Sequence, residues 1–397
     1  MRDLSSALHP LTTALAFPPG RGRAAQAEQW TRVLGPGAPP PPLRLLAEQP
    51  LVASHELQAG IELQLGQLLS FLHPHMEPTP VMRATWPSIK RPDVLSVDLA
   101  IVEDLTVERG WSLRWVEFQG FTSIVASLYT LHMAAQELLP PARDLAPCQS
   151  PPGGDWLRAL TDWVAPGEAG IVLENSPQAQ ATLFDLNAAA RLFNRPLVDP
   201  AQLLRTSSQL SYRDADGRAH PVERILNRSF LHEVAHRAAF EHLASAAPVH
   251  WHSHPAWYDG ISKALLAQMP QPAGLRCTTA DRWRELGLPA TALVAKNIHS
   301  YGGAAVHLHV EAAWLDGLAD ASHWLVQPRY TPHALFSASD GHPVWGEVRC
   351  IVALPENSSP WIAAQVIRLS RTAKVSAAGL NGTPGTGLSL LYRPDGL

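Results

Sequence analysis

Cysteine is scarce in this chain of 397 residues, and that scarcity excludes two classes of protein. The three cysteines, Cys148, Cys277 and Cys350, are far apart in the sequence, and no C-x-x-C pair occurs. A disulfide scaffold needs a dense set of cysteines, and a cysteine-rich zinc site needs closely spaced pairs. The sequence therefore predicts neither.

Charge is sparse as well. Charged residues make up 17% of the chain, below the usual value of about a quarter. The 31 Lys and Arg residues against 35 Asp and Glu residues leave a formal net charge of −4. Because attraction to nucleic acid or to anionic lipid needs excess positive charge, we expect neither a nucleic-acid nor a membrane partner. The sequence has no long apolar run and no signal peptide, so we expect a soluble, cytoplasmic protein, and nothing in it indicates an oligomeric state.

Three motifs of common enzyme folds are missing too. The chain has no G-x-S-x-G nucleophile elbow, no Walker A loop and no G-x-G-x-x-G dinucleotide fingerprint. Any nucleotide or hydrolase site must therefore be built in another way.

The first 90 residues are expected to form a helical region that a proline-rich connector interrupts. Residues 24–34 have a helical pattern, and residues 35–42, with glycine and consecutive prolines, cannot continue a helix. Residues 43–72 return to helical spacing, with apolar residues at steps of three or four. This second helix is expected to bury one apolar face.

Strand patterns begin at residue 94. Residues 94–102 form an apolar run that a single acid, Asp98, interrupts. Residues 113–119 alternate between apolar and polar types, as a half-buried strand does. A helix is expected to follow at 123–139.

The middle of the chain has the order of an α/β layer. Residues 170–174 are typical of a strand, 178–193 of a helix and 196–199 of a strand again. Residues 214–217, Asp-Ala-Asp-Gly, predict the turn of a hairpin.

The last third is expected to contain several antiparallel strands with short turns, in a different and smaller architecture. A helix is predicted at 261–269. The expected strands are 292–296, 304–310, 324–329, 345–354 and 362–370. The whole chain is thus predicted to be of the α+β class.

A candidate phosphate site lies in this last third. Lys296 ends an apolar strand, and Ser300, Tyr301, Gly302 and Gly303 follow it before the next strand. Glycine lets backbone N–H groups approach anionic oxygens, and the lysine supplies a point charge. The glycine pair alone is equally typical of a plain hairpin turn.

Three further residues fit the same chemistry. Lys263, near a helix start, is a second candidate cation, although such a lysine is usually only solvated. Gln327 stands where an apolar strand turns polar, an edge that can present backbone groups to an adenine ring. Arg349 interrupts an apolar strand and needs an anion, which is either a phosphate or a nearby acid.

This order of a lysine, a strand lysine, a Gly-Gly loop, a strand with Gln and a strand with Arg resembles the nucleotide-binding part of the ATP-grasp superfamily. The segment 116–123, Val-Glu-Phe-Gln-Gly-Phe-Thr-Ser, resembles the Glu-Tyr-Asn-Ala-Asp-Thr-Pro segment of glutathionylspermidine synthase-like proteins. Those proteins are circularly permuted ATP-grasp ligases. The resemblance covers residues 90–397 as a series of short matches.

The resemblance implies an ATP-grasp fold with circularly permuted strand order and an α/β pre-ATP-grasp-like layer. The N-terminal helical region would span 1–90, and the metal-binding strands and helix 91–150. The pre-ATP-grasp-like domain would span 151–247, and the nucleotide-binding subdomains 248–397.

The resemblance also implies an activity, namely an ATP- and Mg²⁺-dependent carboxylate–amine ligase that acts through an acyl phosphate. Its substrates would be a small-molecule or peptide carboxylate and an amine. Lys263 and Lys296 would hold the ATP phosphates under the loop at 300–303, and Gln327 would lie beside the adenine. Arg349, the catalytic residue, would contact the γ-phosphate or the acyl phosphate.

For the metal, the resemblance implies that Asp98 and Glu117 bind Mg²⁺, with Gln119 at the position of the family's asparagine. Three departures stand out. Gln119 is longer than asparagine, Phe121 replaces an acid in the acceptor region, and Ser96 replaces an arginine two residues before the aspartate. These departures indicate either an amine substrate that differs from the family's or a protein that binds nucleotide without catalysis.

A zinc hydrolase is the competing hypothesis. His232, Glu233 and His236 fit H-E-x-x-H, and His242 adds a third histidine. On a helix the two histidines would share a face and could hold Zn²⁺, with Glu233 as general base. Ala239, however, stands where the three-histidine version of this motif has a glycine. Two alternating histidine sets could also bind metal, although hydrogen-bonded or solvated side chains are the simpler expectation; they are His250, His252 and His254, and His307 and His309.

Overall fold

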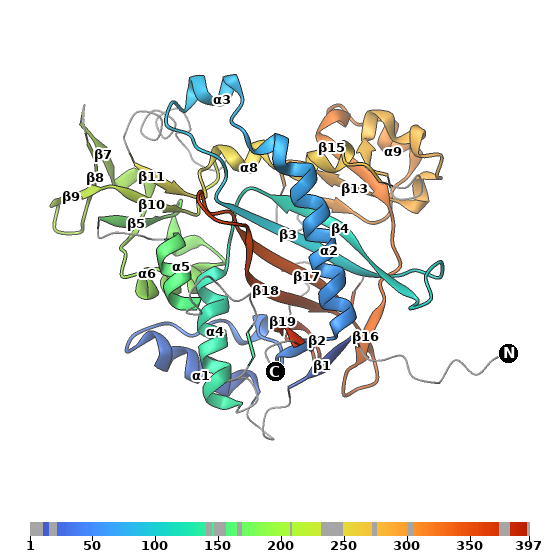
Figure 1. Ribbon diagram of the computed structural model, residues 1–397, viewed down its shortest axis with the longest axis horizontal. Coiled ribbons are helices and arrows are strands. Elements are labelled where there is room, and N and C mark those ends of the chain that lie inside the picture. Colours follow the sequence, from blue (N-terminus) through green and yellow to red (C-terminus); the bar gives the residue numbers. More distant parts are fainter. Residues whose placement is uncertain are drawn as a thin grey trace.

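The structure is a computed structural model, and it describes residues 11–15, 22–139, 145–146, 156–164, 169–206, 209–231, 249–271, 276–300, 305–372 and 382–394. The chain builds one large central sheet with two smaller sheet-containing lobes beside it (Figure 1). The fold is therefore mixed α+β, as the sequence predicts.

The central sheet has eight strands and joins the two ends of the chain. From one edge its order is β1 (Thr12–Ala14), β2 (Leu51–Ala53), β19 (Gly387–Tyr392), β18 (Trp361–Ser370), β17 (Pro343–Ala353), β3 (Val94–Glu103) and β4 (Trp111–Gln119), with β16 (Ala334–Ser337) also paired to β17. Strands from the first third of the sequence thus lie directly beside strands from the last third.

The two faces of this sheet have different coverings. In β3 the odd-numbered residues Leu95, Val97 and Leu99 pack in one apolar cluster with the leucines of α2 (His55–Leu72). Because side chains alternate along a strand, Asp98 points to the opposite face. α2 starts where it does because Ser54 caps it, its Oγ accepting the N–H of Leu57 at 3.1 Å.

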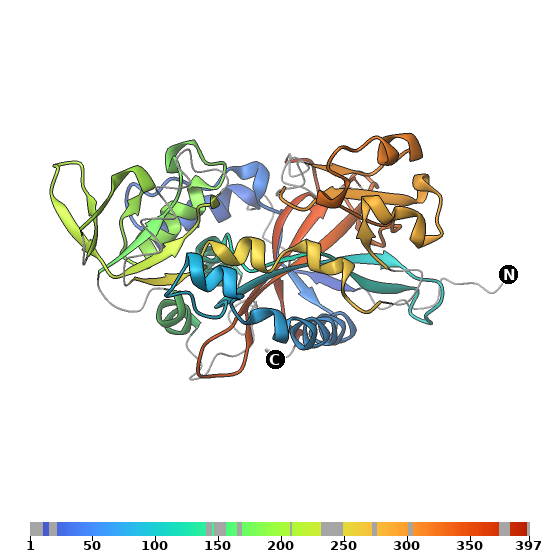
Figure 2. The ribbon, with the colours of Figure 1, turned by 90° about the horizontal axis from the view of Figure 1, so that it is seen from above.

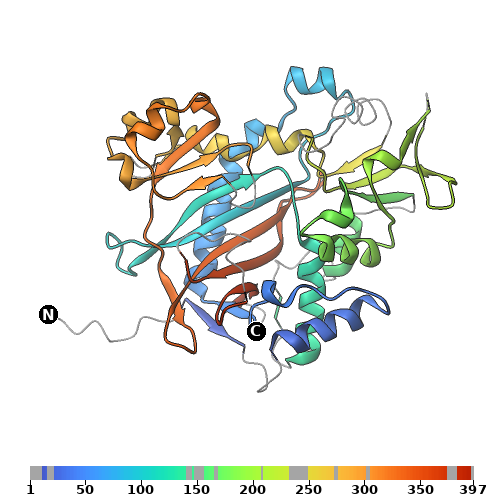
Figure 3. The same cartoon turned by 180° about the vertical axis from the view of Figure 1, so that it is seen from behind.

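The opposite face meets a second apolar cluster at the β18 and β19 end. There α4 (Val125–Leu138) packs against these two strands and against α1 (Arg23–Leu34) (Figure 3). The rest of this face, over β3, β4 and β17, carries the charged residues described below.

One lobe is a four-stranded parallel sheet. Its order is β11 (His250–His252), β10 (Arg224–Asn227), β5 (Gly170–Leu173) and β6 (Leu197–Val198), and α6 (Leu183–Leu192) lies between β5 and β6 in sequence. An antiparallel three-stranded ribbon extends this lobe, namely β7 (Leu203–Arg205), β8 (Leu210–Arg213) and β9 (Ala219–Val222).

The other lobe is a small antiparallel sheet. Its order is β12 (Thr278–Thr279), β15 (Trp324–Pro328), β13 (Leu293–Asn297) and β14 (Val306–His307), with α9 (Ala312–Asp316) against it. Figure 2 shows that both lobes stand on the side of the central sheet away from α2. The remaining helices are α3 (Pro80–Thr85), α5 (Trp156–Val164) and α8 (Ala256–Gly260).

Most expected elements are present. The strands at 94–102 and 113–119 and the helix at 123–139 appear as β3, β4 and α4. The strand–helix–strand order of the middle segment is confirmed as β5, α6 and β6 with parallel pairing, and the 214–217 turn joins the antiparallel pair β8 and β9.

Three expectations are wrong in part. The helix expected over 43–72 begins only at His55, because Leu43–Leu45 is a separate 3₁₀ turn. The helix expected at 261–269 is a short 3₁₀ turn, Lys263–Ala267. The strands expected at 345–354 and 362–370 do not join the small sheet, because β17 pairs with β3 and carries β18 into the central sheet. Within the described ranges, none of the helices combines the length and the hydropathy that a bilayer crossing requires.

Candidate functional site

A cavity of about 700 Å³ lies on the face of the central sheet away from α2. Residues of the central sheet line it together with Lys296 and Gln327 of the small antiparallel sheet. On the other side, Glu174 and Arg228 line it from the ends of two strands of the parallel sheet. The cavity therefore touches the central sheet, the parallel sheet and the small antiparallel sheet.

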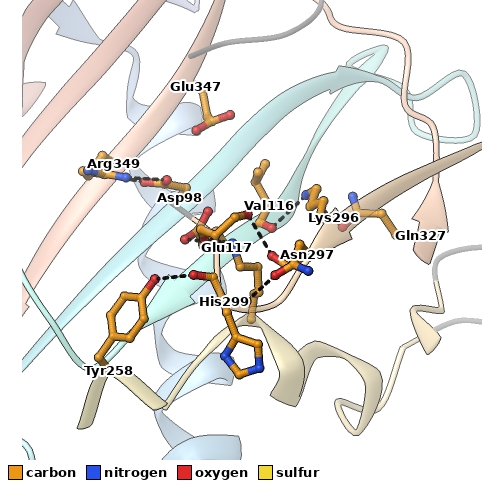
Figure 4. A network of polar contacts seen from close by, with 12 residues as sticks. Asp98, Val116, Glu117, Tyr258, Lys296, Asn297, His299, Gln327, Glu347 and Arg349 are labelled. Atoms are coloured by element: carbon orange, nitrogen blue, oxygen red, sulfur yellow. Dashed lines mark hydrogen bonds and ion pairs between the residues drawn. The ribbon is translucent and has the colours of Figure 1, made fainter. Parts of the chain in front are cut away.

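Strand register brings four charged side chains together on the cavity floor. Arg349 of β17 is the cross-strand partner of Asp98 in β3, and Arg368 of β18 is the partner of Glu347 in β17. The Asp98 carboxylate accepts hydrogen bonds from Nε and Nη2 of Arg349, both at 2.7 Å (Figure 4). It also accepts one from Nη2 of Arg368 at 2.6 Å. Arg368 also forms an ion pair with Glu347.

These contacts fix the charges of the floor. Burial alone would raise the pKa of Asp98, but Arg349 and Arg368 outweigh it and hold that pKa below its usual range. Burial would likewise lower the pKa of Arg349, and the Asp98 charge overcomes this and raises it. The contacts therefore favour the ionised form of Asp98 and the protonated form of Arg349.

Lys296 lies at the junction of the small sheet and the central sheet. Its Nζ donates to the carbonyl of Val116 in β4 at 2.9 Å and to Oε1 of Gln327 at 3.0 Å (Figure 4). Burial lowers the pKa of Lys296 to about 8, against the opposing effect of the Glu117 charge. The ammonium is thus held in place, and it begins to lose its proton as the pH approaches 8.

Lys263 lies on the other side of Glu117. Its Nζ is 3.6 Å from Oε1 of Glu117 and donates to the carbonyl of Ser300. Glu117 is the cross-strand partner of Asp98, so the acids expected to act together are adjacent on the sheet. The 3₁₀ turn that carries Lys263 packs against β4 and β15, which fixes its position.

The structure brings most of the predicted residues into one place. The cavity is lined by Asp98, Glu117, Gln119, Lys296, Gln327 and Arg349. Lys263 and Ser300 contact each other beside it. Tyr301, Gly302 and Gly303 lie outside the described residues, so their part in the site stays a prediction.

Two side chains have contacts that the sequence left open. Arg349, for which an acid and a phosphate were both expected as partners, contacts Asp98. The side-chain oxygen of Gln327 accepts a hydrogen bond from Lys296. The expected contact with an adenine would therefore fall to the strand backbone rather than to this oxygen.

The histidine hypotheses divide. His232, Glu233, His236 and His242 lie outside the described residues. His252 contacts Asp93, with Nδ1 and Oδ2 at 2.5 Å. His254 is buried, which lowers its pKa to about 3, and its Nδ1 accepts the N–H of Ala256.

The second histidine set also lies among protein groups. The His307 ring packs against those of Trp314, in a tilted arrangement, and Trp324, edge-on. In the part of the chain that the structure describes, no group of three His, Cys, Asp or Glu side chains is arranged to hold a metal ion.

Sequence reasoning missed several charged cavity residues, among them Glu174, Arg228, Glu347 and Arg368. Glu347 stands two residues before Arg349 on the same strand, so alternation alone puts both on one face. Arg368 interrupts the apolar strand β18. Glu174 and Arg228 each follow directly after a strand, the position at which parallel sheets present functional side chains.

Comparison with known proteins adds one finding. No model of a protein family matches the chain, and no curated protein matches it. Among solved structures, a glutathione synthetase-like effector from Globodera pallida in its apo form matches with a TM-score of 0.53 and 11% identity. The match covers 86% of this chain and 89% of that chain. The chain has a glutathione synthetase-like fold. At this identity the likeness concerns the fold alone, and the cavity must be judged on its own residues.

Proposed function

We propose that the chain is an ATP- and Mg²⁺-dependent carboxylate–amine ligase with a circularly permuted ATP-grasp fold. The observation that carries the proposal is the arrangement at one end of the cavity. Two buried lysines, Lys263 and Lys296, flank the carboxylate of Glu117, and the edge of β15 lies next to Lys296. Buried ammonium groups beside a cavity need anions, and phosphates supply them.

The roles follow from these positions. The phosphates of ATP would lie between Lys263 and Lys296, beside Ser300. The adenine lies against the end of β15, where the backbone near Gln327 borders the cavity. Arg349 lies on the floor, where a guanidinium can contact a transferring phosphoryl group.

Magnesium fits this donor set. Mg²⁺ is usually held by one or two carboxylates together with substrate phosphates and water. Glu117 and Gln119 line the cavity two residues apart on β4 and offer a carboxylate and an amide oxygen. Asp98 already accepts three arginine hydrogen bonds, so it completes the site only as Arg349 or Arg368 moves toward phosphate. When bound, the ion would neutralise phosphate charge.

The reaction proceeds in two balanced steps. A carboxylate oxygen of the first substrate attacks the γ-phosphorus, and ADP leaves, which forms an acyl phosphate. The amine nitrogen of the second substrate then attacks the acyl carbon, phosphate leaves with the electrons of the C–O bond, and the nitrogen loses a proton. The cationic groups act by position and charge, as phosphoryl transfer requires.

The first test is the melting temperature of EDTA-treated protein with and without millimolar Mg·ATP. Ligand at about 100 times its Kd stabilises the folded state by roughly 2.7 kcal/mol, which raises the melting temperature by several degrees. We expect a Mg²⁺-dependent rise in the wild type and none in Lys296→Ala. Lys90→Ala is the control, because Lys90 is an exposed lysine paired with Glu356. An unchanged ATP response in Lys296→Ala would refute the phosphate assignment.

A non-catalytic nucleotide-binding protein is the second candidate. The contacts of Asp98 with two arginines favour it, because they occupy the acid that resembles a metal ligand. ADP release with pairs of carboxylate and amine separates the two, since a binding protein shows the ATP-dependent stabilisation without turnover.

A further inference from the structure

The end of the cavity away from Lys263 and Lys296 is lined by two charged residues of the parallel sheet, Glu174 and Arg228. Glu174 follows the end of β5, and Arg228 follows the end of the neighbouring strand β10. Ligands of open α/β sheets bind outside the carboxyl ends of the strands. This edge is therefore a candidate ligand-binding edge, at the end of the cavity away from Lys263 and Lys296.

Arg228 is a buried guanidinium with donors to spare. Its side chain is 5% exposed, and its Nη1 forms an ion pair with Asp185. Among the residues that the structure describes, its buried Nε has no hydrogen-bond partner. A buried donor without a partner is costly, and a carboxylate that bridges two N–H groups of a guanidinium removes that cost.

Asp185 is held by more contacts than its ion pair with Arg228. Its carboxylate also accepts the N–H of Ile124 at 3.0 Å and, at 2.9 and 2.7 Å, the N–H and Oγ of Ser127. These donors belong to the first turn of α4, where the helix dipole favours an anion. Asp185 is thus held by α4 as well as by Arg228, which fixes the guanidinium while its other N–H groups stay free of Asp185.

The wall beside this guanidinium is aromatic. Phe121 and Phe230 both line the cavity, and their rings are 4.6 Å apart. Tyr258 packs behind Phe230 at 4.5 Å. An aromatic or other apolar group is buried favourably here, whereas a cationic chain would meet no acid at position 121.

We propose that Arg228 binds the carboxylate of an aromatic α-amino acid, whose ring packs against Phe121 and Phe230 and whose amine is the acceptor. This rests on the proposed function, since it names the amine substrate of that ligase. Arg228 supplies a fork that matches a carboxylate, and the aromatic pair supplies the apolar pocket.

The test measures binding without turnover. L-phenylalanine, L-phenylalanine amide and L-alanine are titrated into the wild type by calorimetry, at concentrations up to tens of millimolar. We expect L-phenylalanine to bind at least about tenfold more tightly than either comparison compound, because one lacks the carboxylate and the other the ring. Equal affinity for the acid and the amide, or no binding of L-phenylalanine, would overturn the proposal.

Variants assign the effect to Arg228. Arg228→Met should weaken L-phenylalanine at least tenfold, while Arg224→Met, at the opposite end of the same strand, should not change it. If Arg228→Met does not fold, Asp185→Asn/Arg228→Met removes both charges together. Arg228→Lys keeps the ion pair with Asp185 but loses the fork, so it too should bind more weakly. Wild-type affinity in a folded Arg228 variant refutes the assignment.

The ATP-dependent melting shift, measured on the same samples, keeps the two proposals apart. A shift with ATP but no L-phenylalanine binding refutes the amino-acid site and leaves the nucleotide site standing. Carboxylate-dependent binding of L-phenylalanine without an ATP shift supports the Arg228 site and refutes the ligase.

Discussion

Burial of Lys296 gives the nucleotide site a dependence on pH. The lowered pKa, about 8, means that the ammonium loses its proton as the pH rises from 7 to 9. Phosphate attracts only the protonated form, so ATP affinity should fall above pH 8 by up to about tenfold per pH unit. Lys296→Arg stays charged over this range and should have a flat profile. Calorimetric Kd values at pH 7, 8, 9 and 10 measure both, and parallel profiles would contradict the assignment.

The ion pair between Glu347 and Arg368 should show strong coupling in stability. Breaking a buried pair by removing one partner costs about 3–5 kcal/mol, because it leaves an unpaired charge. We expect Arg368→Met to be destabilised by an amount of this order, and Glu347→Gln/Arg368→Met to recover part of the loss. Urea unfolding of the double-mutant cycle gives the coupling.

The exposed pair Arg282 and Glu285 is the matched control for that cycle. Solvent screens such a pair, so Arg282→Met should unfold close to the wild-type midpoint. A Glu347 and Arg368 cycle without coupling would show that the two charges do not depend on each other.

At the residue scale, sequence could indicate which side chains matter but not whom they contact. Asp98 and Arg349 stand out because each interrupts an apolar strand, and a charge in such a place needs a partner. That they are each other's partner depends on the register between β3 and β17, which are about 250 positions apart. Arg368 interrupts the apolar strand β18 in the same way, and its contact with Asp98 likewise depends on strand register.

At the scale of elements, a glycine sets how closely α8 approaches β4. Gly120 directly follows β4, its N–H donates to the carbonyl of Ile261 at 2.8 Å, and a Cβ there would lie 2.7 Å from the carbonyl oxygen of Trp257. Gly120→Ala should therefore push α8 and the turn that carries Lys263 away from Glu117. We expect a loss of about 1–3 kcal/mol in unfolding free energy together with weaker ATP binding.

Gly66→Ala is the control for that substitution. Gly66 lies inside α2, and a Cβ there meets nothing within 4 Å. Replacing an exposed helical glycine should stabilise the protein by about 0.5–1 kcal/mol. Urea unfolding and the ATP-dependent melting shift are measured on both variants. Wild-type ATP binding in Gly120→Ala would mean that this contact does not position Lys263.

Element boundaries followed local signals where these were strong. The alternation of 113–119 predicted β4, and the apolar runs at 94–102 and 362–370 predicted β3 and β18, because such local patterns need no tertiary information. The helix starting at His55 was expected to begin at residue 43, because the apolar spacing of 43–45 continues the pattern while Ser54 provides the actual cap. The short strand β19 follows a Gly- and Thr-rich segment that hid its pattern.

At the scale of the whole molecule, pairing between distant strands decided what sequence could not. The strands of the last third were expected to form one small architecture, but β17 and β18 complete the central sheet beside β3, and only β12 to β15 form the separate lobe. The α+β class could be predicted from the mixture of periods. The cavity could not be predicted, because it forms only where the central sheet, the parallel sheet and the small antiparallel sheet come together.

Two buried histidines should make the stability of the whole fold sensitive to acid. Burial lowers the pKa of His132 to about 4 and that of His254 to about 3, so both are neutral in the folded state. Unfolded histidine titrates near 6.5, so between about pH 6.5 and 4 the unfolded state binds more protons, and stability falls as the pH falls. Each histidine contributes up to about 1.4 kcal/mol per pH unit.

Urea unfolding at pH 7.5, 6.5, 5.5 and 4.5 measures this slope, which His132→Gln should reduce and His132→Gln/His254→Gln should reduce further. His250→Gln, at an exposed position of β11, should retain the wild-type slope. An equal slope in all four proteins would mean that other groups cause the acid sensitivity. Asp98 is not one of them, because its arginine contacts lower its pKa below this range.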